Sequence, residues 1–176
     1  MLYIKTKIMK QLKFFATYST DFMKMRFFIL LLVLGALFSA PARANVRVID
    51  GDSLMVNGVE VRLEGIDAPE YHQECYDKND KPYPCGKEAY EFLLEIVGQD
   101  TTCEEIEKDR NHRSVAVCHS QGKNLNQEMV ANGWAVAYTS YTNAFAKEER
   151  DAKSAKKGIW QGSFMRPELY RALVRK

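Results

Sequence analysis

The segment "VIDGDSLMVNGVEVRLEGIDAPE", residues 48–70, constrains the fold more than any other part of the sequence. Apolar and polar residues alternate on both sides of Asn57-Gly58, which predicts β-strands over 53–57 and 59–65. Asn-Gly between alternating strands is a strong signal for a two-residue hairpin turn, because both residues tolerate positive φ. A short strand is also expected at 46–49, so three strands follow one another at the start of the sheet.

Four acidic residues lie at the two ends of this hairpin. Asp50 and Asp52 precede the second strand, while Asp67 and Glu70 follow the third, so the hairpin places the two pairs side by side. Carboxylates this close raise one another's pKa unless a cation lies between them, and their oxygen atoms suit Ca²⁺ or Mg²⁺. Arg62, on the returning strand, offers a planar pair of donors for a phosphate group. A metal ion, a guanidinium group and a carboxylate that does not bind the metal are groups that a phosphodiesterase can use for catalysis.

The rest of the chain shows helical and extended patterns without internal repeats. The chain is expected to leave the sheet at "IDAPE", because Pro69 cannot continue a strand, and to form a polar loop over 71–85. Further expected elements are a helix over 86–97, a hairpin from Cys103 to Cys118, a helix over 125–132 ending at Gly133, an extended segment over 134–141 and a charged helix over 143–157. This order is typical of a five-stranded Greek-key β-barrel of the OB-fold type with packed helices, which is the fold class we predict.

The N-terminal extension, residues 1–44, is expected to lie outside the folded domain. A basic start at Arg26, an apolar run from Phe27 to Phe38 and small-residue triplets ending at Ala44 have the layout of a secretory signal peptide. The apolar run is shorter than the roughly 20 residues that a bilayer-spanning helix needs. The prediction is therefore an exported protein, periplasmic or secreted, and the alternative is an uncleaved membrane anchor formed by residues 26–38.

Removing this extension changes the charge of the chain. Residues 1–44 contain seven of the 25 Lys and Arg and one of the 23 Asp and Glu, so the remainder carries 18 basic and 22 acidic side chains. A global basic field for nucleic acid is therefore absent, and phosphate binding must be local or assisted by a metal cation. The predicted organisation is a barrel domain over 45–161 and a C-terminal tail over 162–176 packed on it.

All four cysteines follow the extension, and an even number in an exported chain predicts disulfide bonds. Cys103 and Cys118 begin and end a strand–turn–strand pattern whose symmetry places them opposite each other. Cys75 and Cys85 flank the polar loop. We therefore predict the pairs Cys75–Cys85 and Cys103–Cys118, and the alternative of a four-cysteine zinc site lacks the usual C-x₂-C pair.

Five segments, taken in order, resemble the staphylococcal nuclease (thermonuclease) family: "VIDGDSLMV", "VRLEGIDAPE", "DRNHRSVAVC", "LNQEMVANGWAVAY" and "AKKGIW". None of the segments is specific alone, and the resemblance rests on their order over about residues 45–161. It implies an OB-type barrel and Ca²⁺-dependent hydrolysis of phosphodiester bonds in DNA and RNA. It also implies a monomer that prefers single-stranded or locally open nucleic acid, with no protein partner evident.

The resemblance implies a metal site by matching positions. Asp52 and Asp67 would be carboxylate ligands of Ca²⁺, and the backbone carbonyl of Ala68 would be a further ligand. Asp50 would lie behind these ligands without touching the ion. The cation would offset the charge of the phosphate group and polarise the attacking water.

The resemblance also implies catalytic and nucleotide-binding residues. Arg62 and Arg113 would bind the scissile phosphate and stabilise the charge of the transition state, and Glu70 would orient or deprotonate the attacking water. The residues expected beside the nucleotide, where an aromatic ring can stack on a base, are Arg110, Tyr138 and Tyr141.

Two departures from the family pattern fall in "DRNHR". Asn111 stands where an aromatic residue is usual, and His112 stands where Gly is usual, which predicts positive φ at His112. Arg113 has the alternative of pairing with Asp109 or Glu107 across the turn, as a surface ion pair. The acidic cluster has the alternative of being a solvated rim, and the alternative function is a non-catalytic module of the same fold that binds nucleic acid or protein.

Overall fold

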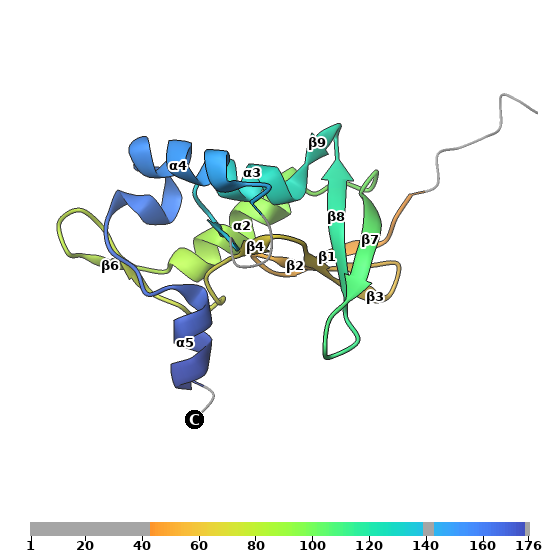
Figure 1. Ribbon diagram of the computed structural model, residues 1–176, viewed down its shortest axis with the longest axis horizontal. Coiled ribbons are helices and arrows are strands. Elements are labelled where there is room, and N and C mark those ends of the chain that lie inside the picture. Colours follow the sequence, from red (N-terminus) through yellow and green to blue (C-terminus); the bar gives the residue numbers. More distant parts are fainter. Residues whose placement is uncertain (1–42, 139–142, 175–176) are drawn as a thin grey trace, which may run out of the picture. The chain divides into compact units, whose positions relative to one another are not determined.

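The computed structural model describes residues 43–138 and 143–174 (Figure 1). The predicted signal peptide up to residue 42, the alternative anchor over 26–38 and Tyr141 lie outside these residues. Within the two described ranges, no helix is long and apolar enough to cross a membrane.

A curled sheet organises the described part of the chain. Its hydrogen-bonded order is β1 (Val46–Asp50), β2 (Ser53–Val56), β3 (Val59–Leu63), β8 (Ser114–Ser120) and β7 (Thr102–Lys108), with β9 (Lys123–Asn124) pairing with β8. All neighbours are antiparallel except β3 and β8, which run parallel. The curled sheet with its covering helices confirms the predicted OB-type fold class (Figure 1).

The hairpin that the sequence predicts between β2 and β3 is present. Asn57 and Gly58 have φ angles of 52° and 83°, the left-handed values that a tight turn between twisted strands requires. The pairing of Ser53 with Arg62 brings this arginine beside the start of β2. Strand β3 ends two residues earlier than predicted, because the chain turns at Gly65, whose φ is 73°.

The chain leaves the main sheet at "IDAPE", as predicted, but it enters a second small sheet that the sequence did not indicate. There β4 (Ile66–Asp67) pairs antiparallel with β10 (Val136–Ala137). The main-chain N–H of Tyr138 extends this ladder by donating to the carbonyl of Gly65 at 2.9 Å. The buried Glu149 side chain also accepts from the N–H of Ala137 at 3.2 Å. These bonds fix the chain at Asp67.

Helices cover the sheet and close the core. They are α2 (Cys85–Ile96), α3 (Leu125–Ala131), α4 (Ala146–Ser154), the 3₁₀ helix η1 (Gly158–Gln161) and α5 (Pro167–Val174). The first two match the predicted helices within one residue, whereas α4 is shorter than the predicted 143–157. Fully buried Leu54, Leu93 and Met129 show where the sheet, α2 and α3 meet. Helix α5 was not predicted.

Both predicted disulfide bonds are present, and each closes a hairpin. Cys103 and Cys118 face each other on β7 and β8, in the register that the sequence symmetry predicts. Cys75 and Cys85 are joined across a shorter hairpin of β5 (Cys75–Tyr76) and β6 (Pro82–Tyr83), where the sequence predicted only a polar loop. The zinc alternative is therefore wrong, because no cysteine is free.

Candidate active site

The turn from β1 to β2 forms the floor of the site. The N–H of Asp52 donates to the carboxylate of Asp50 at 3.1 Å, which closes the turn on itself. A Cβ atom on Gly51 would lie 2.8 Å from the Cβ of Ala68 and 3.1 Å from that of Ala89. Only glycine therefore lets this turn pack directly against Ala68 and helix α2, which explains why the two acids flank a glycine.

Arg62 joins acids from the two ends of the hairpin. Its Nη2 atom lies 2.7 Å from Oδ2 of Asp52 and 2.9 Å from Oδ1 of Asp67. Both carboxylates are almost fully buried, at 3% and 2% exposure. The N–H of Ala68 also donates to Asp52 at 3.3 Å. The fold thus brings together Asp52, Arg62, Asp67 and Ala68, residues that sequence reasoning placed in one site.

Two acids of this site, Asp50 and Asp67, have raised pKa values. Burial raises the pKa of Asp50 to about 7, and the neighbouring charge of Asp52 adds to the rise. Burial also raises the pKa of Asp67 above its ordinary value, although its hydrogen bond with Arg171 opposes the rise. Burial is thus the largest cause of the raised pKa at both carboxyls, and the charge of Asp52 adds to it.

A second arginine reaches the acids from helix α5. The Nη1 atom of Arg171 lies 2.8 Å from Oδ1 of Asp67 and 2.8 Å from Oε1 of Glu70. Burial lowers the pKa of this guanidinium, but the two carboxylates outweigh burial and raise the pKa above its ordinary value. The sequence did not predict a role for Arg171, because no motif or regular spacing connects a basic residue of the C-terminal tail with Glu70.

Arg113 lies on the other side of the site and is held by its own hairpin. Its Nη2 atom lies 2.8 Å from Asp109 and its Nη1 atom 3.6 Å from Glu60. Partial burial lowers the pKa of Arg113, while the hydrogen bond and charge of Asp109 raise it above its ordinary value. The charge of Asp52 acts on Arg113 in the same direction, although no hydrogen bond joins the two. The structure therefore shows the pairing with Asp109 that the sequence left open.

The residues expected beside a nucleotide are only partly placed. Arg110 is exposed at the turn between β7 and β8, and Tyr138 is half-buried directly after β10. His112, in the same turn, has a φ of 62°, which confirms the positive φ predicted there. Its strain is partly relieved by a hydrogen bond from its N–H to the carbonyl of Asp109 at 2.9 Å. Tyr141 lies outside the described residues.

The donor chemistry of the floor fits a hard divalent cation. Asp52, Asp67 and the main chain of Ala68 offer oxygen atoms alone, the type that Ca²⁺ and Mg²⁺ prefer. Across residues 43–138 and 143–174, no three His, Cys, Asp or Glu side chains form a group that could hold a metal ion. A cation bound here would therefore need water or a substrate oxygen to complete its coordination. The guanidinium of Arg62 contributes the positive charge between Asp52 and Asp67, and that of Arg171 adds positive charge beside Asp67.

Comparison with known proteins gives consistent matches. Residues 60–162 match the sequence model of the family described as "Staphylococcal nuclease homologue". The chain is 35% identical over 125 residues to the succinoglycan biosynthesis protein ExoI of Rhizobium meliloti, an alignment that covers 69% of this chain and 65% of that protein. It is 30% identical over 143 residues to an uncharacterized endonuclease of Haemophilus influenzae, covering 74% and 75%.

A plant protein matches over a smaller part of its length. The chain is 34% identical over 116 residues to the probable staphylococcal-like nuclease CAN1 of Oryza sativa subsp. japonica. That alignment covers 64% of this chain and 32% of the plant protein. The chain thus spans just under two thirds of ExoI and about a third of CAN1.

Proposed function

The chain belongs to the staphylococcal nuclease family, and from this premise we propose that it is an exported nuclease with Ca²⁺ as its cofactor. Its substrates are the phosphodiester bonds of DNA and RNA. The barrel domain over 45–161 carries the reaction, and the tail over 162–176 packs on that domain.

One observation carries the proposal: acids from the two ends of the β2–β3 hairpin meet the guanidinium of Arg62 in one buried patch. Asp52, Arg62 and Asp67 are joined by bonds of 2.7 and 2.9 Å, although neither acid is a sequence neighbour of Arg62. A solvated rim would leave its carboxylates exposed with ordinary pKa values. Here burial raises the pKa of both Asp50 and Asp67. Buried acids with raised pKa values are more frequent in functional sites than elsewhere on a protein.

Different residues of this chain would bind the cation, the phosphate group and the attacking water. Asp52, Asp67 and the Ala68 carbonyl would hold Ca²⁺, which supplies positive charge that offsets the phosphate. Arg62 exchanges its carboxylate partners for phosphate oxygens and binds them more strongly as negative charge grows in the transition state. Glu70, whose side chain is 34% exposed, orients or deprotonates the attacking water, with positioning as its first role.

A second group of residues would hold the rest of the nucleotide. Arg113 supplies a second guanidinium to the scissile phosphate once the phosphate replaces Asp109 as its partner. Arg110 is exposed for a terminal phosphate, and Tyr138 and Tyr141 lie along the segment expected to stack on a base. Because stacking on a tyrosine needs an unpaired base, binding should favour single-stranded or locally open nucleic acid. Because the arginines bind phosphate groups, binding should weaken with salt.

Export is supported by two features that come from separate parts of the chain. Residues 25–44 have the layout of a signal peptide, and both pairs of cysteines form disulfide bonds in the described domain. Disulfide bonds persist in oxidising compartments such as the periplasm or the exterior of the cell. A monomer with no resident protein partner suits a small exported hydrolase.

The first test is cleavage by the full chain, purified with its disulfide bonds intact. Single-stranded DNA, duplex DNA and RNA are each incubated with Ca²⁺ or with EDTA. We expect cleavage only with Ca²⁺, and we expect Arg62→Ala and Glu70→Ala each to lower kcat by about 100-fold or more. Arg47→Ala is the matched control, because Arg47 is an exposed arginine on strand β1 of the same sheet.

Two results would contradict the proposal. A folded wild-type protein that binds nucleic acid without cleaving it would favour the non-catalytic module of the same fold. Cleavage that survives both substitutions would show that the acidic patch is not the active site.

A further inference from the structure

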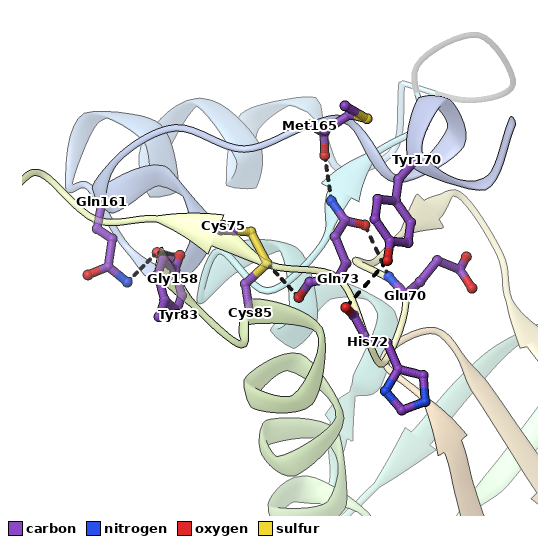
Figure 2. The surroundings of a disulfide bond; sticks show 10 residues. All are labelled: Glu70, His72, Gln73, Cys75, Tyr83, Cys85, Gly158, Gln161, Met165 and Tyr170. Carbon is purple, nitrogen blue, oxygen red and sulfur yellow. Dashed lines mark hydrogen bonds between the residues drawn. A yellow bond between two sulfur atoms is a disulfide. The ribbon is translucent and has the colours of Figure 1, made fainter. Parts of the chain in front are cut away.

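The C-terminal arm, residues 163–174, is attached to the chain that carries Glu70. Ser163 and Tyr76 exchange two main-chain hydrogen bonds, of 2.8 and 3.0 Å, beside the Cys75–Cys85 disulfide. The hydroxyl of Tyr170 donates to the carbonyl of His72 at 3.4 Å (Figure 2). The arm is thus held at Ser163 by the loop that the disulfide closes and at Tyr170 by the residues that precede this loop.

Gln73 connects the arm to Glu70 from inside the protein. This side chain is fully buried, and its Nε2 atom donates to the carbonyl of Met165 at 2.7 Å (Figure 2). Its Oε1 atom accepts from the N–H of Glu70 at 3.3 Å, and its own N–H donates to the carbonyl of Glu70 at 2.7 Å. One buried amide therefore fixes the backbone of Glu70 and the path of the arm together.

Arg171 connects the arm with Glu70 a second time, through a contact between the two side chains. Its Nη1 atom donates to Oε1 of Glu70 and, at the same distance of 2.8 Å, to Oδ1 of Asp67. Its side chain is 21% exposed, so the guanidinium is largely enclosed at the edge of the site. Glu70 is thereby held from two directions, by Gln73 at its backbone and by Arg171 at its carboxylate.

We propose that Arg171 is a positioning residue of the active site, which holds the Glu70 carboxylate in place for the attacking water. The C-terminal arm is then part of the catalytic apparatus. This inference rests on the proposed nuclease function, and it assigns a role to a residue that the family resemblance did not include.

The contacts favour a positioning role over a plug that blocks the cation. Arg62, rather than Arg171, lies between Asp52 and Asp67, the two carboxylates proposed to bind the ion. Within the described residues, Arg171 pairs with Asp67 and Glu70 alone. Glu70 is not a proposed ligand, so the pair of Arg171 with Glu70 persists when a cation takes the place beside Asp67. The several attachments of the arm also oppose its release.

A double-mutant cycle on the full chain tests this role. With Ca²⁺ and single-stranded DNA, we expect Arg171→Ala to lower kcat by about tenfold or more while KM changes less than about threefold, because misplaced groups slow the chemical step. In a Glu70→Gln background, the same substitution should cause almost no further loss, since Arg171 acts through the Glu70 carboxylate.

Matched variants separate positioning from folding. Arg166→Ala removes an exposed arginine from the same arm, whose partner is Glu168 at 3.8 Å, and should leave kcat unchanged. Arg171→Gln keeps the aliphatic part of the side chain and should reproduce the loss caused by Arg171→Ala. Thermal unfolding of each variant shows whether the fold is retained.

Calcium binding gives a readout that does not depend on turnover. Calorimetric titration without substrate should show tighter Ca²⁺ binding in Arg171→Ala, because Asp67 loses a competing positive charge. Unchanged or weaker affinity would overturn the contact with Asp67 on which the proposal depends.

The remaining outcomes are equally decisive. Unchanged or faster turnover by folded Arg171→Ala would overturn the proposal, and faster turnover would identify the arm as an inhibitor. An equal loss in the Glu70→Gln background would also overturn it, by showing that Arg171 acts on the substrate itself. An inactive wild-type protein would instead reject the proposed function, while the calcium titration would still test the contact.

Discussion

The acidic patch has an arginine near it from each of two regions. The Cys75–Cys85 disulfide closes the β5–β6 hairpin, which supports the C-terminal arm, and the Cys103–Cys118 disulfide joins β7 and β8 in a longer hairpin. In Figure 1, α5 lies to the left of β7 and β8. Arg171, from the arm, reaches Asp67 and Glu70, whereas Arg113, from the longer hairpin, stays with Asp109.

The difference comes from local partners of each arginine. Asp109 accepts hydrogen bonds from the N–H groups of Asn111 and Arg113, so the turn of the β7–β8 hairpin holds its own acid next to its own arginine. The acid of the arm, Glu168, pairs with Arg166 and not with Arg171, and the arm is anchored to the backbone around Glu70. An arginine that lies near the acidic patch therefore does not always contact the patch, because an acid in its own turn can bind the guanidinium instead.

Removing the two disulfide bonds one at a time should give the largest difference in kcat between the two regions. Each closes a loop of similar length, so replacing either pair with serine should lower the free energy of unfolding by about 3 kcal/mol. The Cys75→Ser/Cys85→Ser variant should also lower kcat by about tenfold or more, because it loosens the anchor of the arm and Glu70. Cleavage assays and denaturant unfolding of the two double variants measure both effects.

The Cys103→Ser/Cys118→Ser variant is the matched control. Its disulfide lies at the end of the β7–β8 ladder away from Arg113, and the ladder pairs from Thr102 to Lys108 remain to hold the turn. At a temperature where it is folded, this variant should keep the kcat of the wild type. Equal losses of kcat in both variants would remove the distinction between the two regions.

Asp50, in the floor of the site, and Asp109, in the β7–β8 hairpin, should respond to pH in opposite directions. Asp50 has a pKa raised to about 7 by burial, so between pH 4 and 7 the folded state retains a proton that the unfolded state releases. Its contribution to stability is therefore lost as the pH rises. In EDTA, Asp50→Asn should be more stable than the wild type by roughly 2 kcal/mol at pH 8 and no different below pH 4.

Asp109 provides the opposite response. Its partial burial raises its pKa, but hydrogen bonds from the main chain and side chain of Arg113 outweigh this effect and lower the pKa below its ordinary value. Its stabilising contribution is present above the unfolded pKa and disappears as the pH falls through the folded value. Asp109→Asn should therefore flatten the acid limb of the stability curve. Equal pH profiles for the two variants would show that the acids do not differ in this way.

The sequence predicts those parts of the structure that depend on residues close together in the chain, and it does not predict those that depend on residues far apart. The β2–β3 hairpin and the Cys103–Cys118 pair depend on alternation, a turn and local symmetry, so the sequence predicts them. The pairing of β4 with Val136–Ala137 joins residues about 70 positions apart, and no local pattern encodes it. Arg171 and Glu70 are 101 positions apart, and their contact depends on the buried Gln73, whose role is visible only after folding.

The smallest expected effect concerns the partner that holds Arg113. Asp109→Asn removes the charge that retains this arginine, so a substrate phosphate no longer competes with a carboxylate. KM should fall by about twofold to fivefold, because this half-buried pair lies at the surface, where an ion pair is worth about 1 kcal/mol, and kcat should change little. Steady-state kinetics at low salt measure the change, and Lys108→Ala on the same hairpin is the control, since Lys108 pairs with Glu105 instead. If KM is unchanged, Arg113 does not reach the substrate, and the β7–β8 hairpin serves the fold while the arm alone serves the site.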